Sequence, residues 1–129
     1  MVALLDSTVL IDYLRGRPVV GRVQELWERG EAPCTTAINV EEIVRGLRPA
    51  EESAAQALFE GLEILSIGAD EGRRAGRWRR EFSARGITLW QADCLIAAAA
   101  ANRGAILVTG NPTDFPMPDV TVEHWPVGD

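Results

Sequence analysis

Apolar and polar positions follow two different rhythms along this chain. Short apolar runs, typical of buried strands, occur at 2–6, 33–36, 62–66, 105–109 and 120–124. Longer segments with helical spacing of apolar residues lie between them, at 8–15, 19–29, 39–47, 50–61, 69–84 and 90–102. Strands that alternate with helices predict an α/β domain with a central, mainly parallel sheet, and we expect a single domain over 1–129.

The composition is that of a globular domain. At 129 residues, of which 47% are hydrophobic, the chain can bury a substantial core. It has no apolar run long enough to cross a bilayer and no signal-peptide pattern, so we expect a cytoplasmic protein with no membrane association. Cys34 and Cys94 lack metal-type spacing and have apolar neighbours, so we expect buried free thiols.

Two absences narrow the chemistry. All 13 basic residues are arginine, so the chain has neither a Schiff-base lysine nor a phosphate-binding P-loop. The single histidine, His124, argues against zinc sites built on several histidines and against histidine general-base catalysis. We expect His124 to be a surface or strand residue. Carboxylates are the reactive side chains that remain.

Acidic residues follow two of the predicted strands. Asp6 ends the first apolar run, and Asp114 lies in the loop that leaves the run 105–108. In open parallel sheets, ligands bind at the carboxyl ends of the strands, where strand order reverses, so we expect both loops to face one crevice. A carboxylate buried there is costly unless a cation or hydrogen-bond donors accompany it.

Several of these acids also have an ordinary structural explanation. Asp6 can begin a turn and, with the hydroxyl residues after it, cap the next helix. Glu42 follows Asn39 at the spacing of a capping box. The sequence alone leaves both interpretations open. The neighbouring Glu41 precedes Arg45 by four residues, as in a solvent-exposed ion pair, and we expect it at the surface.

Asp93 and Asp114 differ in how easily they are explained. Asp93 is the only charge in an otherwise nearly apolar helical segment, and we place it too far inside that helix to serve as a cap. Asp114 follows Asn111 by three residues, with Pro112 at the first helical position, which is a complete capping arrangement. Asp93 is therefore the strongest single indication of a site.

One explanation accounts for all four acids, Asp6, Glu42, Asp93 and Asp114. Carboxylates that converge raise one another's pKa values unless a cation lies among them. Mg²⁺ and Mn²⁺ take oxygen ligands and need no histidine or thiol. We therefore expect these residues to bind Mg²⁺ or Mn²⁺.

Four segments carry a resemblance to a known family: LLDSTVLID at 4–12, EIVRG at 42–46, ADCLIAA at 92–98 and LVTGNPTDF at 107–115. In order and spacing they resemble the four motifs of PIN-domain ribonucleases, most of all the VapC-type toxins of toxin–antitoxin modules. The resemblance covers nearly the whole chain. It implies a three-layer α/β/α sandwich with a central, mainly parallel sheet.

The resemblance also implies metal-dependent hydrolysis of RNA phosphodiester bonds. The implied catalytic and metal-binding residues are Asp6, Glu42, Asp93 and Asp114. The implied supporting residues, which would hold water or orient a carboxylate, are Thr8, Thr109 and Asn111. The chain departs from the family pattern at two places. The order Ser7-Thr8 is the reverse of the more common one, which leaves open which hydroxyl faces the metal. Gly110 stands where a larger polar or basic residue is common.

The implied partners are an RNA substrate, tRNA or rRNA, a cognate VapB-type antitoxin, and a second toxin copy in a homodimer or a toxin–antitoxin hetero-oligomer. A net charge of −6 is unfavourable for binding RNA. The arginines, however, gather in the segment 73–85, where an apolar stripe of Ala75, Trp78 and Phe82 would turn them outward. Our candidates for RNA contact are Arg73, Arg77 and Arg80, and a merely solvated helix face is the alternative.

Other functions fit less well. A haloacid-dehalogenase phosphatase needs a second aspartate where this chain has Thr8, and it needs a lysine, as does a phospho-receiver domain. A catalytically inactive PIN-like binding module, whose acidic crevice docks an arginine-bearing partner, stays open. We expect Trp27 in the core rather than in a groove for a partner, and leave Trp90 and Trp125 undecided.

Overall fold

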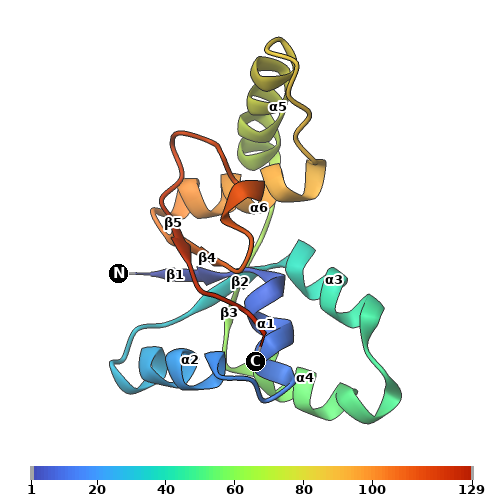
Figure 1. The fold of residues 1–129 in the computed structure, drawn as a ribbon, viewed down its shortest axis with the longest axis vertical. Coiled ribbons are helices and arrows are strands. Elements are labelled where there is room, and N and C mark those ends of the chain that lie inside the picture. The colour runs from blue at the N-terminus through green and yellow to red at the C-terminus, as the bar shows by residue number, and fades with distance from the viewer. Residues whose placement is uncertain (1, 129) are drawn as a thin grey trace.

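A computed structural model describes residues 2–128, in which five parallel strands form one sheet in the order β3-β2-β1-β4-β5 (Figure 1). The strands are β1 (Ala3–Leu5), β2 (Cys34–Thr36), β3 (Glu63–Leu65), β4 (Ile106–Thr109) and β5 (Val122–His124). The chain runs outward from β1 to β3 and then crosses to the other side of β1. Strand order therefore reverses between β1 and β4, whose carboxyl ends carry Asp6 and Thr109.

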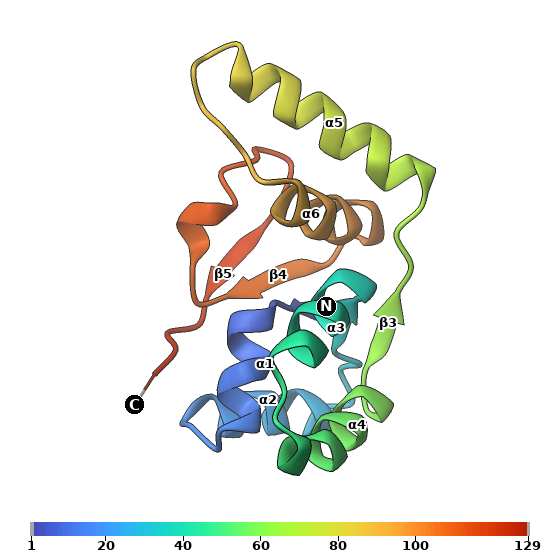
Figure 2. The same cartoon turned by 90° about the vertical axis from the view of Figure 1, so that its right-hand side faces the viewer.

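Helices cover both faces of the sheet (Figure 2). They are α1 (Ser7–Leu14), α2 (Val19–Glu28), α3 (Ala37–Gly46), α4 (Glu52–Glu60), α5 (Ala69–Ser83) and α6 (Gln91–Arg103), with the short 3₁₀ turns η1 (Pro49–Glu51) and η2 (Pro112–Asp114). The α5–α6 pair lies on one side of the sheet, and α1, α2 and α4 lie on the other. This arrangement confirms the predicted three-layer sandwich.

Two apolar cores result from the alternation of side chains along the strands. Leu4 and Leu107 point into the core under α5 and α6, and Leu5 and Val108 point into the core under α1 and α2. Because both faces are covered, β1 is apolar throughout and β4 is apolar up to Thr109. β1 and β4 are thereby held rigidly, which sets the position of the polar residues at their carboxyl ends.

The alanine run of α6 is among the most deeply buried parts of the molecule. Ala97, Ala98 and Ala100 expose no surface, which lets this helix approach the sheet and α5 closely. Gly104 ends the helix with a φ of 69°, in the left-handed region that favours glycine.

Most sequence expectations about single elements are confirmed. Cys34 and Cys94 are buried free thiols, and His124 lies exposed on β5. The expected position of Asp93 inside its helix is wrong. Because α6 begins at Gln91, Asp93 belongs to the first turn of the helix. None of the helices within residues 2–128 has the length and apolar character of a membrane span.

Close packing around α6 predicts a stability effect. Ala98→Leu should destabilise the fold by roughly 1–3 kcal/mol, because extra methylene groups in a filled core displace their neighbours. Ala54→Leu, at an exposed position of α4, should change stability by less than about 0.5 kcal/mol. Urea unfolding of both variants measures the difference, and equal stabilities would contradict the packing argument.

Candidate active site

Asp6 lies buried where β1 meets α1, with 7% of its surface exposed. It precedes the first residue of α1, yet its side chain makes no capping hydrogen bond to that helix. Its Oδ2 instead accepts hydrogen bonds from the hydroxyl groups of Thr109, at 2.7 Å, and Thr8, at 3.3 Å. The interpretation of this carboxylate as a helix cap is therefore wrong, and both threonines lie beside it.

Asn39 supplies the other donor to Asp6. Its Nδ2 donates to Asp6 Oδ1 at 3.3 Å and to Ser7 Oγ at 2.9 Å, and the side chain is completely buried. Its Oδ1 accepts from the backbone N–H and the hydroxyl of Thr36, which caps α3. One amide thus joins the start of α3 to the start of α1.

Asn39 was not predicted as a site residue, because the sequence spacing suggested a capping box of Asn39 with Glu42. The capping box is formed by Thr36 and Asn39, and the pattern Thr-x-x-Asn that begins at the last residue of the short run 33–36 is its sequence signal. Glu42 lies on the next turn of α3 and is not needed to start the helix.

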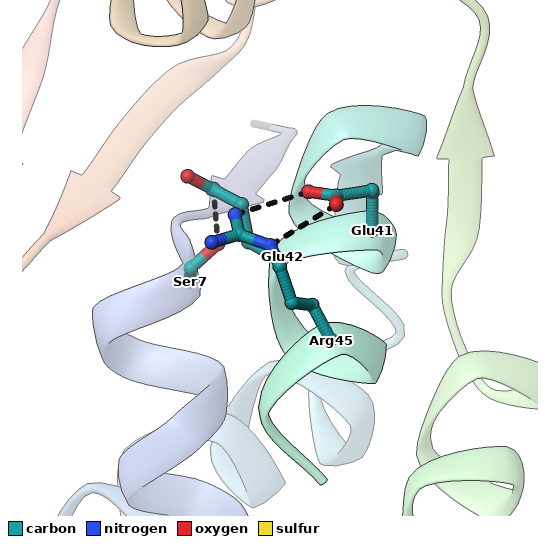
Figure 3. Close-up of polar contacts among 4 residues, drawn as sticks. All are labelled: Ser7, Glu41, Glu42 and Arg45. Carbon is teal, nitrogen blue, oxygen red and sulfur yellow. Dashed lines mark hydrogen bonds and ion pairs between the residues drawn. The ribbon is translucent and has the colours of Figure 1, made fainter.

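Glu42 instead reaches toward α1, where Ser7 Oγ donates to its Oε1 at 2.9 Å (Figure 3). The neighbouring Glu41 points to the exposed side of α3 and forms two hydrogen bonds with Arg45, each 3.1 Å long. The ion pair expected for Glu41 is confirmed. Of the two adjacent glutamates, only Glu42 faces the residues around Asp6, and Ser7 is the hydroxyl that it uses.

Asp93 is half-buried in the first turn of α6, and the charges of the other acids affect its pKa. Its pKa is raised to about 6, mainly by burial and then by the negative charges of Asp114, Asp6 and Glu42, in that order of size. Burial also raises the pKa of Asp6, against the hydrogen bond from Thr109, and Asp114 adds to the rise. These effects indicate that the four carboxylates lie near enough to one another for their charges to interact.

Asp114 lies exposed in η2, beyond the end of β4. Asn111 precedes this turn but makes no side-chain capping bond, so the expected cap is absent from it. Its backbone N–H donates to Thr109 Oγ1 at 3.0 Å, and the N–H of Gly110 donates to Thr8 Oγ1 at 2.9 Å. The two threonine hydroxyls thus link the Asp6 carboxylate to the loop that leads to Asp114.

The C-terminal segment packs against this loop at Gly110. A Cβ atom added to Gly110 would lie 2.7 Å from Cγ1 of Val127, so the glycine leaves room for that side chain. The segment is tied to α1 because the backbone N–H of Gly128 donates to the buried carboxylate of Asp12, whose other oxygen lies 3.6 Å from Arg17 Nη1. A larger residue at 110 would have to displace Val127.

The donor set fits a hard divalent cation. The four residues offer carboxylate oxygens that range from buried to exposed. The pKa values of Asp6 and Asp93 are raised in part by neighbouring negative charge, and a cation would offset this charge. Within residues 2–128, no three His, Cys, Asp or Glu side chains are close enough to hold one ion as they stand. Mg²⁺ usually keeps several waters and binds through one or two carboxylates, so it does not require such a cluster.

The predicted arginines lie apart from this centre, on α5. The apolar stripe of that helix is buried as expected, and Arg73, Arg77 and Arg80 are exposed. Arg73 pairs with Asp70 at 2.6 Å. Contact of these arginines with RNA stays a prediction.

Comparison with known proteins agrees with the site. A family model described as PIN domain matches residues 3–116. Ribonuclease VapC19 of Mycobacterium tuberculosis is 36% identical over 121 residues, which span 91% of this chain and 95% of that protein. A tRNA(fMet)-specific endonuclease VapC of Salmonella typhimurium is 27% identical, over 95% of this chain and 96% of that protein.

A solved structure shares the fold. The crystal structure of VapBC2 from Rickettsia felis, bound to a DNA fragment from its promoter, contains a chain with a TM-score of 0.82 at 22% identity, covering 97% of this chain and 99% of that one. The chain described here belongs to the PIN-domain family. Within it, the curated relatives named above are VapC nucleases.

The charges around Asp93 predict its titration in the metal-free protein. Its carboxyl should titrate near pH 6 by carbon NMR with EDTA present, and Asp114→Asn should lower that pKa by removing the largest neighbouring charge effect. Asp70→Asn, on the exposed surface of α5, serves as the control and should leave it unchanged. An Asp93 pKa that does not change in Asp114→Asn would contradict the inferred proximity of these two acids.

The raised pKa of Asp93 also determines how the stability of the metal-free protein changes with pH. Protonation of Asp93 favours the folded state, so this contribution is complete below the ordinary pKa of 3.8 and is lost as pH rises through about 6. Between pH 4 and pH 7, the metal-free Asp93→Asn variant should therefore lose less thermal stability than the unmodified protein. Thermal unfolding followed by circular dichroism at both pH values measures this difference, and equal losses would contradict it.

Proposed function

We propose that this protein is an endoribonuclease that hydrolyses RNA phosphodiester bonds with Mg²⁺ or Mn²⁺, and that it acts as a toxin held inactive by a cognate antitoxin. The observation that carries the proposal is the buried Asp6, oriented by Thr109, Thr8 and Asn39 at the point where strand order reverses. Membership of the PIN-domain family and relatives named as ribonucleases support it.

Asp6 and Asp93 are the proposed main metal ligands, with Glu42 and Asp114 completing the set. A divalent cation bound there would lower the pKa of water and offset the charge on phosphate oxygens. The chain's own contribution is orientation: three hydrogen bonds hold the Asp6 carboxylate in one rotamer before any ligand arrives. Such neighbours of ligating carboxylates commonly set metal affinity and activity.

Glu42 and Asp114 are suited to handle the proton of the attacking water. Glu42 is half-buried and held by Ser7 through one oxygen, so its other oxygen stays available. Asp114 is exposed on a short turn and accessible to solvent. Either carboxylate can orient water at the edge of the crevice and pass its proton to solvent.

RNA binding by an acidic protein requires that its cations be gathered in one place. The exposed arginines of α5 meet this need, because Arg77 and Arg80 show no ion pair within residues 2–128, while Arg73 is partly neutralised by Asp70. A bound cation would also reduce the net negative charge of the four carboxylates. We propose that α5 contacts the phosphate backbone.

A groove beside the site supports the antitoxin proposal. A cavity of about 150 Å³ lies between α1, α3 and η1, with Ile11, Leu14 and Ile43 in its wall and Glu42 at its margin. Arg15, Arg48 and Glu51 also line it, so an amphipathic segment of a partner seated there would pass close to the acidic crevice. The solved toxin–antitoxin complex from Klebsiella pneumoniae contains a chain with a TM-score of 0.78 at 26% identity, covering 97% of this chain and 99% of that one. The likeness supports assembly with a VapB-type antitoxin, and with a second toxin copy, as proposals.

The alternative is a binding module without turnover, whose acids dock an arginine-bearing partner. The observation that favours it is that, within residues 2–128, no three His, Cys, Asp or Glu side chains lie close enough together to hold one ion. Metal dependence separates the two functions, because an enzyme needs Mg²⁺ or Mn²⁺ for cleavage while a docking module binds its partner with or without the ion.

Adjacent glutamates provide a matched test of the site. Asp6→Asn and Glu42→Gln should each lower metal-dependent RNA cleavage by at least about a hundredfold, because each removes a carboxylate from the acidic centre. Glu41→Gln removes the same charge one residue away and should leave cleavage unchanged. Cleavage is followed on total RNA by sequencing of the new ends, with and without Mn²⁺. Full activity of Asp6→Asn would overturn the assignment.

The arginine proposal predicts a change in salt dependence. Replacing Arg77 and Arg80 by alanine should weaken RNA binding and reduce the slope of log K against log salt by roughly 1.4, about 0.7 for each phosphate that is no longer neutralised. Addition of Arg73→Ala should change less, since that side chain is paired. The control replaces Arg29 and Arg103, which pair with Glu25 and Glu63. An unchanged slope in the α5 variant would exclude phosphate contact.

A further inference from the structure

The connection from α5 to α6 exposes apolar surface close to the acidic centre. Trp90 ends this connection with 70% of its surface exposed, more than any other large hydrophobic side chain in residues 2–128, and Ile87 is 43% exposed. A tryptophan held in solvent forgoes the stabilisation that burial of its ring would provide. A partner that covers the ring would provide this stabilisation.

The backbone around Trp90 is fixed although its side chain is exposed. Trp90 is the N-cap of α6, and its carbonyl accepts the backbone N–H of Cys94 at 3.0 Å. The preceding Leu89 is buried, and its carbonyl accepts a hydrogen bond from Arg79 Nε at 3.2 Å. The indole thus projects from a rigid base, which lowers the entropy cost of binding a flat ligand to it.

Trp90 also lies next to a proposed catalytic acid. Asp93 is the third residue of α6, and the N-cap residue and the third helical residue are neighbours on the first turn. The indole and the Asp93 carboxylate therefore leave the same end of α6. A ligand covering the ring would reach the acidic centre within one helical turn.

Positive charge accompanies the ring. Arg79 is anchored at the carbonyl of Leu89, one residue before Trp90. The carbonyl that holds Arg79, the exposed ring of Trp90 and the proposed site residue Asp93 therefore all lie within residues 89–93. Proteins that bind single-stranded nucleic acid combine aromatic rings for bases with cations for the backbone.

We propose that Trp90 is a stacking platform for an unpaired base beside the phosphodiester that is cleaved, with Arg79 near the adjoining phosphate. The inference rests on the proposed ribonuclease function and assigns Trp90 the role of positioning one base of the RNA. Bases can be unstacked onto an aromatic side chain in loops and ends, but not within an intact A-form helix.

A binding measurement tests this apart from catalysis. In the Asp6→Asn background, which prevents cleavage, Trp90→Ala should weaken binding of a fluorescein-labelled 12-nucleotide single-stranded RNA by on the order of tenfold in fluorescence anisotropy. Trp90→Phe should retain most of the affinity. An abasic oligomer of the same length should bind both variants and the Asp6→Asn protein alike. Ile64→Ala, at an exposed position of β3, is the control and should change neither affinity.

Several results would overturn the proposal. Equal binding of the RNA by Asp6→Asn with and without Trp90→Ala would do so, as would an equal loss on the abasic oligomer or no binding of the RNA by either protein. A change in oligomeric state or in antitoxin binding without a change in RNA affinity would assign Trp90 to a protein interface instead. The ribonuclease function fails separately, if the unmodified protein produces no metal-dependent RNA ends.

Discussion

The Asp6 carboxylate is buried at the carboxyl end of β1, where its charge is tolerated only because neighbouring elements bring donors to it. Thr109 comes from the end of β4, Thr8 from α1, and Asn39 from the start of α3. The polar groups that stabilise Asp6 are therefore also the groups that join these elements at the crevice. Stability and the geometry of the acidic centre depend on the same hydrogen bonds, so a substitution among them affects both.

The acids around the crevice are not paired with arginine in the part of the chain that the structure describes. Burial raises the pKa of Asp93 most, and the charges of the other acids add to the rise, so a bound cation would offset part of this cost. Six of the 13 arginines lie on α5 or in the connection that follows it, and of these six only Arg73 forms an ion pair within residues 2–128. A net charge of −6 is therefore compatible with an anionic substrate, since local arrangement and not the total decides the contact.

Periodicity was sufficient to predict the elements, because each strand and helix buries a face whose spacing is visible in the sequence. Two of the four acids carry local signals, namely the lone charge at Asp93 and the strand-end position of Asp6, and the catalytic role of all four stays a prediction. The hydrogen-bond partners of Asp6 are not visible in local patterns. The family resemblance named Thr8 and Thr109, whereas Asn39 was not predicted. Thr109 and Asn39 lie 103 and 33 residues from Asp6, and only the order of the strands brings them to it. The role of Asn39 was misassigned because an asparagine at this position can be explained by local capping alone, and its contact with Asp6 leaves no local pattern in the sequence.

The packing of Val127 over Gly110 has a consequence for how sequences of this kind diverge. Any side chain at 110 larger than hydrogen meets Val127 at less than contact distance, so the two positions are constrained as a pair rather than singly. Relatives with a bulky residue at the first position should carry a small one at the second, or route their last residues differently across the sheet. Covariation between these columns of an alignment would record that constraint.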